Sequence, residues 1–210
     1  MTEEPRYRTE QEQFWAGSFG NDYIERNTGE LLLASNLNFF TGAMNRARDV
    51  RSCIEFGANI GMNLQAISLL FPQLDLHAVE INTTAVKRLA ELVPPENIYH
   101  GSILDYEPER SWDLALIKGV LIHINPDFLP VVYDKLVRST RRYLLVAEYY
   151  NPTPVTIPYR GQSDRLFKRD FAGEIMDLYP EFKLVDYGFQ YRRDPNFPQD
   201  DISWFLMERS

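Results

Sequence analysis

Apolar runs of strand length alternate with helical patterns through the middle of the chain. The runs are short, and glycine, proline or polar residues bound each of them. We expect strands at 51–57, 74–81, 97–100, 112–117 and 143–148, and helices at 62–71, 83–92 and 126–139. An alternation of this kind builds a parallel sheet with helices on both faces.

The two ends of the chain follow other patterns. The first fifty residues are typical of helix, and we expect residues 1–47 to form a helical flank or lid. Near the other end, a helix at about 167–179 precedes two apolar runs at 183–191 and 202–208, which a turn rich in Pro and Asp connects. These two runs predict a terminal antiparallel hairpin.

The combined pattern predicts one α/β domain over residues 1–210, with a Rossmann-like core at 51–210. We expect a seven-stranded, mostly parallel sheet that ends in an antiparallel hairpin, with helices on both faces. A plain dinucleotide-binding domain more often ends in another helix-linked parallel strand.

Composition restricts the partners of the protein. With 210 residues, 44% of them hydrophobic, the chain can bury one sizeable core. The net charge of −8 argues against a nucleic-acid partner, and we expect no DNA binding. A single cysteine and three dispersed histidines predict no metal site. No stretch approaches the ~20 apolar residues of a membrane helix, so we expect a cytoplasmic protein without a membrane partner.

A glycine-rich turn joins the first expected strand to the first expected helix of the core. It reads Glu55-Phe56-Gly57-Ala58-Asn59-Ile60-Gly61. Gly57 allows a sharp turn close to a ligand, and Gly61 allows close approach at a helix N-terminus, where free N–H groups favour a carboxylate. Two glycines at this spacing also occur in turns that bind nothing.

Two later segments strengthen the interpretation of a ligand site. Glu80 lies nineteen residues after Gly61, near the tip of the next strand, where a carboxylate accepts hydrogen bonds from the two hydroxyls of a ribose. Ile81 follows it. Ser102 and Ile103, after the third strand, stand where a small polar residue and a backbone N–H can face an adenine ring. Asp105 either belongs to this set or only caps a turn.

The segments EFGANIG, VEIN, GSILD and WDLALIKGVLIHINP resemble, in this order, the motifs of class I S-adenosylmethionine-dependent methyltransferases. The resemblance covers roughly residues 51–148. More narrowly, FGANIGMNL, KGVLIHINP and EYYNPTPVTIPYRGQSDRLFKRDFAGE resemble the pseudaminic acid biosynthesis-associated methylases. One departure from the class I pattern is Asn59, where many members have a third glycine.

The resemblance implies that S-adenosyl-L-methionine is the cofactor and that a methyl group passes to an oxygen or nitrogen atom. The residues expected to bind the cofactor are Glu55, Gly57, Ala58, Asn59, Gly61, Glu80, Ile81, Ser102, Ile103 and Lys118. Lys118 is expected beside the sulfonium. NAD is the rival ligand, but the full G-x-G-x-x-G spacing of its binding turn is missing.

Two candidates for catalysis follow the fourth expected strand of the sheet. His123 has an unperturbed pKa near neutrality and can take a proton from an acceptor hydroxyl or amine. Lys118 is the second candidate. The alternative for His123 is a packed or backbone-bonded side chain.

A proline-containing segment after the fifth expected strand is the expected acceptor site. It concentrates aromatic, amide and basic side chains, which suit stacking on a ring and pairing with an anion. We expect substrate contacts from Tyr149, Tyr150, Asn151, Tyr159, Arg160, Arg165 and Lys168. In the alternative interpretation the arginines only pair with surface acids such as Asp164 and Asp170.

The expected substrate is a small anionic metabolite, and the family resemblance implies a nonulosonic (pseudaminic) acid sugar or its nucleotide-activated form. Two alternatives stay open: an acceptor in tRNA or protein, and a catalytically silent scaffold that only binds the cofactor. The sequence leaves the oligomeric state undecided.

Overall fold

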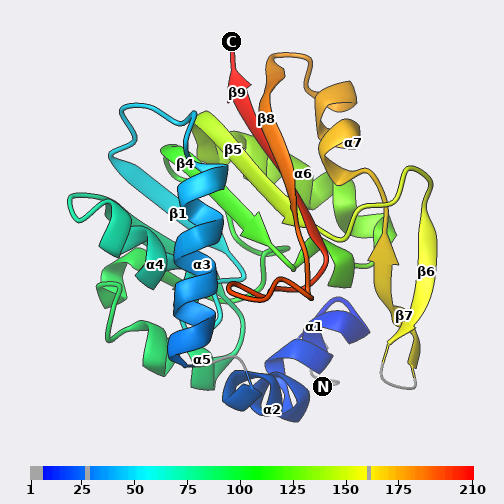
Figure 1. Ribbon diagram of the computed structural model, residues 1–210. Helices are drawn as coiled ribbons and strands as arrows, with labels where there is room; N and C mark the ends of the chain where they lie inside the picture. Colours follow the sequence, from blue (N-terminus) through cyan, green and yellow to red (C-terminus); the bar gives the residue numbers. More distant parts are fainter. Residues whose placement is uncertain (1–6, 27–28, 160–161) are drawn as a thin grey trace.

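A seven-stranded sheet with helices on both faces forms the body of the protein (Figure 1). The computed structural model describes residues 7–26, 29–159 and 162–210. The order of the strands across the sheet is β3-β2-β1-β4-β5-β9-β8. These strands are β1 (Ser52–Phe56), β2 (Asp75–Glu80), β3 (Ile98–His100), β4 (Trp112–Lys118), β5 (Thr140–Glu148), β8 (Phe182–Gln190) and β9 (Ile202–Arg209).

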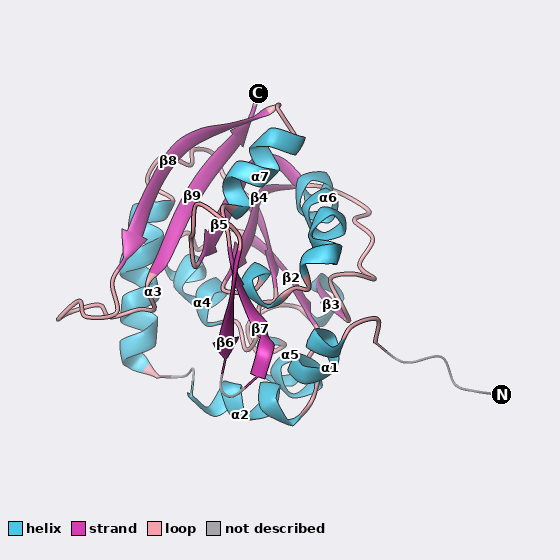
Figure 2. Ribbon diagram, turned by 90° about the vertical axis from the view of Figure 1, so that its right-hand side faces the viewer, coloured by secondary structure: helices cyan, strands magenta, loops and turns pink. Residues whose placement is uncertain are grey.

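Each face of the sheet has its own hydrophobic core, because successive strand residues point to opposite faces. On one face Cys53 packs with apolar side chains of α3 (Glu30–Ala43), α4 (Met62–Leu70) and α5 (Thr83–Leu89). On the other, Ile54 and Phe56 pack with α6 (Leu129–Ser139) and α7 (Phe171–Leu178). The two helical layers flank the sheet in Figure 2.

The parallel core and the terminal hairpin confirm the predicted fold. Strands β1 to β5 are parallel, and β9 pairs antiparallel with both β5 and β8. Some boundaries differ from the predicted ones. Strand β5 begins at Thr140, three residues before the predicted start, and two short 3-10 helices, η2 (Leu121–His123) and η3 (Pro126–Phe128), precede α6.

The segment after β5 differs from the prediction. Strand β6 (Val155–Tyr159) pairs antiparallel with β7 (Gln162–Lys168) in a separate two-stranded sheet, where we expected a loop followed by a helix from about 167. Helix α7 begins only at Phe171, because the Asp170 side chain accepts the N–H of Gly173 at 2.9 Å and caps the helix. Leu166 and Phe167 are buried as strand residues and contribute no helical turn.

The N-terminal helices have two different positions. Phe39 and Phe40 of α3 are fully buried, so this helix belongs to the layer that covers the sheet. Helices α1 (Glu10–Ala16) and α2 (Ser18–Arg26) lie beyond the sheet, on the side where the parallel strands end (Figure 1). A third short 3-10 helix, η1 (Pro95–Asn97), precedes β3. Among the described residues, no helix is long and apolar enough to cross a membrane.

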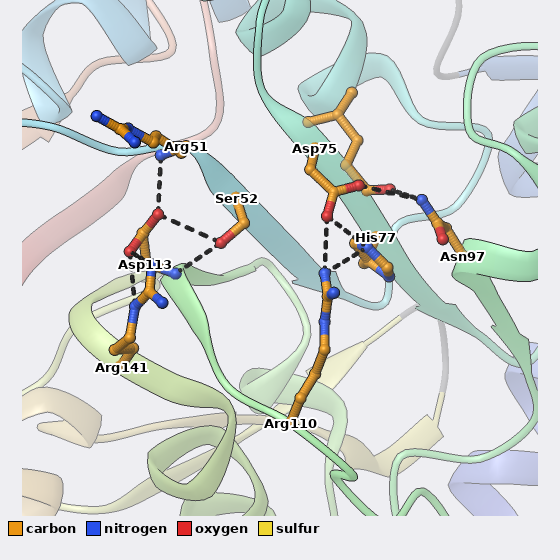
Figure 3. Close-up of polar contacts among 9 residues, drawn as sticks. Arg51, Ser52, Asp75, His77, Asn97, Arg110, Asp113 and Arg141 are labelled. Atoms are coloured by element: carbon orange, nitrogen blue, oxygen red, sulfur yellow. Dashed lines mark hydrogen bonds and ion pairs between the residues drawn. The ribbon is translucent and has the colours of Figure 1, made fainter.

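Two clusters of polar side chains lie at the end of the sheet where the parallel strands begin, opposite α1 and α2 (Figure 3). The Asp113 carboxylate accepts the backbone N–H of Arg51 at 2.9 Å and the guanidinium Nε–H of Arg141 at 2.8 Å. The backbone N–H of Asp113 donates to Ser52 Oγ at 3.0 Å. A second cluster joins Asp75, His77, Asn97 and Arg110. The first cluster connects β1, β4 and β5, and the second connects β2 with the segments before β3 and β4.

Candidate functional site

A cavity of about 210 Å³ opens at the carboxyl ends of the parallel strands. In open α/β sheets this edge is the usual place for a ligand. The sheet side of the cavity is lined by residues from the segments 57–63, 79–82, 102–104 and 118–125. The other side is lined by residues of α1, α2 and α3. Most of the expected cofactor residues line it: Gly57, Ala58, Asn59, Glu80, Ile81, Ser102, Ile103 and Lys118.

The glycine-rich turn between β1 and α4 has left-handed backbone at three positions. The φ angles are 74° at Gly57, 50° at Asn59 and 84° at Gly61. A Cβ atom on Gly57 would lie 2.5 Å from a methyl group of Val120, so a larger residue would push into the segment that follows β4. Asparagine tolerates left-handed backbone better than most residues. The structure therefore accommodates Asn59 at the point where the sequence departs from the class I pattern.

Glu80 presents a fixed carboxylate to the cavity. Its side chain is buried, Oε2 accepts the N–H of Asn59 and Oε1 accepts the N–H of Asn82, both at 2.7 Å. Burial raises the pKa of Glu80, and the backbone hydrogen bonds oppose that rise. A carboxylate fixed in this way at a strand tip is placed to accept hydrogen bonds from the two hydroxyls of a ribose.

The residues around Glu80 suit a nucleoside. Asn59 Oδ1 is buried and has no hydrogen-bond partner among the described residues, so it can accept a donor from a ligand. Ile81 and Ile103 add apolar surface to the cavity wall. A polar edge beside an apolar wall is the arrangement that a ribose and its base require.

Helices α1 and α2 close the cavity through contacts that sequence patterns did not indicate. Ser102 Oγ donates to Glu12 Oε1, and the Asn82 amide donates to the carbonyl oxygen of Trp15 at 3.1 Å. Arg8, just before α1, pairs with Asp105 at 2.6 Å, which gives Asp105 a role other than a simple turn cap. Glu12 and Trp15 both line the cavity. Only the tertiary structure brings them within reach of residues about 70 to 90 positions later.

Glu55 and Lys118 are two titratable residues near the turn, and each influences the pKa of the other. Glu55 is fully buried and does not line the cavity; its Oε1 accepts the amide of Asn63 at 2.6 Å, and its Oε2 has no partner among the described residues. Burial raises the pKa of Glu55 to about 8. Lys118 lines the cavity with its ammonium 5.4 Å from the ring centre of Phe39, and burial lowers its pKa while the nearby Glu55 carboxylate opposes that shift.

Glu148, at the end of β5, holds the segment that carries His123. Its carboxylate accepts the backbone N–H groups of Val120 and Leu121, both at 2.9 Å. Burial raises the pKa of Glu148 to about 7, against these hydrogen bonds. His123 is 8% exposed, lines the cavity, and lies with its ring centre 4.7 Å from that of Trp15. The structure thus places this expected catalytic residue at the cavity, packed by an aromatic ring of α1.

Four of the expected acceptor residues have described side chains, and none of these lines the cavity: Tyr149, Tyr150, Asn151 and Lys168. The Lys168 ammonium lies 5.1 Å from the ring centre of Tyr149. Asn151 donates to the carbonyl oxygen of Thr153. Strand β7 packs against η2, so the hairpin adjoins the His123 segment.

Three expected acceptor residues fall where little or nothing is described. Arg160 lies outside the described residues, and the side chains of Tyr159 and Arg165 also lie outside them. The neighbouring Arg169 pairs with Glu174 at 2.6 Å, so its charge is already matched by an acid of α7. In the described part of the chain, no group of three or more His, Cys, Asp or Glu side chains is arranged to hold a metal ion.

No protein-family model matches the chain, and no curated protein matches it in sequence. Solved structures do match the fold. A Burkholderia thailandensis 1,6-didemethyltoxoflavin-N1-methyltransferase with bound S-adenosylhomocysteine has a TM-score of 0.68 and 13% identity, over 95% of this chain and 87% of that one. A mitomycin 7-O-methyltransferase has a TM-score of 0.64 and 14% identity, over 96% of this chain but only 61% of that longer one.

A third similar structure is an amino pentose methyltransferase from Micromonospora echinaspora, solved with S-adenosylmethionine. It has a TM-score of 0.60 and 8% identity, over 91% of this chain and 96% of that one. At such identities the likeness concerns the fold. The protein has the Rossmann-like fold of class I methyltransferases, as the sequence predicted.

Proposed function

We propose that the protein is a methyltransferase that uses S-adenosyl-L-methionine to methylate an oxygen or nitrogen atom of a small molecule. The observation that carries this proposal is the Glu80 carboxylate. Backbone N–H groups of Asn59 and Asn82 hold it at the wall of a cavity that residues 57–60 of the glycine-rich turn also line. The similar structures support it, since they combine this fold with methyl transfer to small molecules.

The cofactor residues fit different parts of S-adenosylmethionine. Glu80 would hold the ribose hydroxyls, and the N-terminus of α4 after Gly61 favours the carboxylate of the methionine part. Lys118 adds a positive charge to the cavity wall, which also favours a carboxylate. The chemistry that the cofactor supplies when bound is an electrophilic methyl group on a sulfonium.

The protein's own contribution to the reaction is mainly positioning. His123 lines the cavity and is the residue we assign to proton removal from the acceptor hydroxyl or amine. Glu148 fixes the backbone before His123, and Trp15 packs on its ring, so the imidazole has a defined place.

For the acceptor we propose a small anionic metabolite, with a nonulosonic acid sugar or its nucleotide-activated form as the leading candidate. The support is the hairpin that adjoins the cavity, where Lys168 lies over Tyr149. An aromatic ring and a cation together suit a sugar that bears a carboxylate or phosphate. The identity of the sugar rests on the sequence resemblance alone.

The test is transfer of label from methyl-labelled S-adenosylmethionine into a metabolite extract, followed by mass spectrometry. We expect label in the small-molecule fraction with the natural protein, and at least a ~10-fold lower rate with Glu80→Gln at limiting cofactor, since a buried charged acceptor is lost. Glu91→Gln, at an exposed position after α5, is the matched control and should behave like the natural protein. Label found only in tRNA or protein would refute the proposed substrate class.

A further inference from the structure

Glu12 is a buried carboxylate in the cavity wall that the functions assigned above do not use. It lies on α1 and is 7% exposed. Its Oε2 accepts the N–H of Thr9 at 2.7 Å and the hydroxyl of Thr9 at 3.0 Å, while its Oε1 accepts the hydroxyl of Ser102. A carboxylate oxygen accepts two hydrogen bonds, so Oε1 keeps capacity for one more donor.

The position of Glu12 relative to the strands indicates which part of a nucleoside it meets. Ser102, its partner, follows β3, and β3 pairs with β2, which ends at Glu80. Ile81 and Ile103 line the same part of the cavity and would give a base bonded to a ribose on Glu80 an apolar surface. The Ser102 hydroxyl also accepts the N–H of Leu104 at 3.0 Å, so the Glu12 carboxylate is fixed against a rigid turn.

Adenine offers this carboxylate one suitable group. The exocyclic 6-amino group is a hydrogen-bond donor, whereas the ring nitrogens on the exposed edges of the base are acceptors. An acceptor-only carboxylate attracts the amine and repels a carbonyl oxygen at the same place. We propose that Glu12 is the residue by which this protein recognises the 6-amino group of the cofactor's adenine, and so selects adenine over hypoxanthine.

This inference rests on the cofactor part of the proposed function. In this proposal the base is recognised by α1, a helix that precedes the Rossmann-like core. Helix α1 would then both cover the cofactor and bind its base.

The test is calorimetry of the full chain with S-adenosylhomocysteine and with S-inosylhomocysteine, in which a carbonyl replaces the 6-amino group. We expect the natural protein to prefer the adenosyl compound by ~100-fold or more. Glu12→Gln should bind the adenosyl compound ~10-fold more weakly and should lose most of the preference, because an amide can turn its NH₂ group toward the carbonyl. Glu10→Gln, which removes a charge from an exposed position of the same helix, should keep the preference.

A second variant distinguishes base recognition from a purely structural contact between α1 and the segment after β3. Ser102→Ala removes the hydrogen bond to Glu12 but leaves the carboxylate, so both ligands should weaken together and the preference should persist. If Glu12→Gln also lowers the affinity for both ligands by the same factor, Glu12 has only a structural role and the inference is wrong. If the natural protein binds neither compound, the inference fails together with the proposed function; if it binds both equally, only the inference fails.

Discussion

At the scale of the residue, the most unusual feature of this protein is its buried acidic side chains. Glu55 and Glu148 are both buried carboxyl groups whose pKa values burial raises, to about 8 and about 7. Their surroundings differ. Backbone N–H groups satisfy Glu148, whereas one oxygen of Glu55 has no partner among the described residues. A buried carboxyl that is only partly satisfied costs stability once it is ionised.

The first prediction concerns Glu55 and the pH dependence of stability. Because the pKa of Glu55 is raised in the folded state, Glu55 holds its proton in the folded protein but loses it in the unfolded chain between about pH 4.5 and about pH 8. The contribution of Glu55 to the free energy of unfolding should therefore be largest below about pH 4.5 and should be lost as pH rises to about 8. In Glu55→Gln the free energy of unfolding should lose this contribution to its pH dependence, so its slope should change by on the order of 1 kcal/mol per pH unit in the range between about pH 4.5 and about pH 8.

Urea unfolding of the ligand-free protein at several pH values between 5 and 8 measures this effect. Glu91→Gln, at the exposed position after α5, should leave the slope unchanged. An identical slope in Glu55→Gln and in the natural protein would contradict the prediction.

The short segment between β4 and α6 is the decisive part of the site at the scale of the element. It contains η2, which places His123, and its fixed geometry depends on a carboxylate from a neighbouring strand. Three successive N–H groups, of Val120, Leu121 and Ile122, point at Glu148, the last of them at 3.5 Å. Without this acceptor the buried N–H groups would have to find other partners, at a cost of ~1–3 kcal/mol each.

The second prediction follows from this anchor. Glu148→Gln should lower turnover at saturating cofactor by ~10-fold or more, because the amide accepts through one oxygen only and the His123 segment loses its fixed position. The affinity for S-adenosylhomocysteine should change less, since Glu80 lies on β2.

Steady-state rates and calorimetry on the same preparations provide the comparison. Glu208→Gln is the matched control, because Glu208 lies on β9 and pairs with the partly exposed Arg142 at 2.8 Å. An unchanged turnover in Glu148→Gln would show that the position of η2 does not depend on this carboxylate.

The whole molecule encloses its cavity between the sheet and helices that come first in the chain. The Glu12–Ser102 and Trp15–Asn82 hydrogen bonds join α1 to two different strand ends. Since a ligand between these parts contacts both, its binding should stabilise the helices as well as the sheet edge. Local opening of α1 and α2 is then the natural route into the site.

The third prediction is that S-adenosylhomocysteine slows amide hydrogen exchange in α1 and α2 together with the β1–α4 turn. The expected decrease is ~10-fold or more at saturating ligand, because opening the helices would cost binding energy. Helix α7, which packs on the face of the sheet opposite α3, serves as the internal control and should exchange at an unchanged rate. Protection confined to residues 57–61 would show that α1 and α2 do not cover the bound cofactor.

The sequence by itself determined the features that depend on local periodicity and on backbone conformation. Strand–helix alternation predicted the parallel core, because one-sided burial imposes a period of two on strands and 3.6 on helices. Gly57, Gly61 and Glu80 could be found because turns that need left-handed backbone, and acids at strand tips, have local signatures. The prediction of a loop at residues 155–168 was wrong. A short two-stranded hairpin that contains a proline shows only a weak alternation of apolar and polar residues.

Only the tertiary structure decided which distant side chains complete the site. Glu12 meets Ser102 across 90 residues of chain, and Glu148 meets Val120 across 28, so no local pattern of either segment records the contact. The burial that raises the pKa values of Glu55 and Glu148 likewise depends on how the helices cover the sheet. The sequence determines which polar and titratable side chains the site can use. The distances between them and the polarity of their surroundings are set only when the helices pack on the sheet.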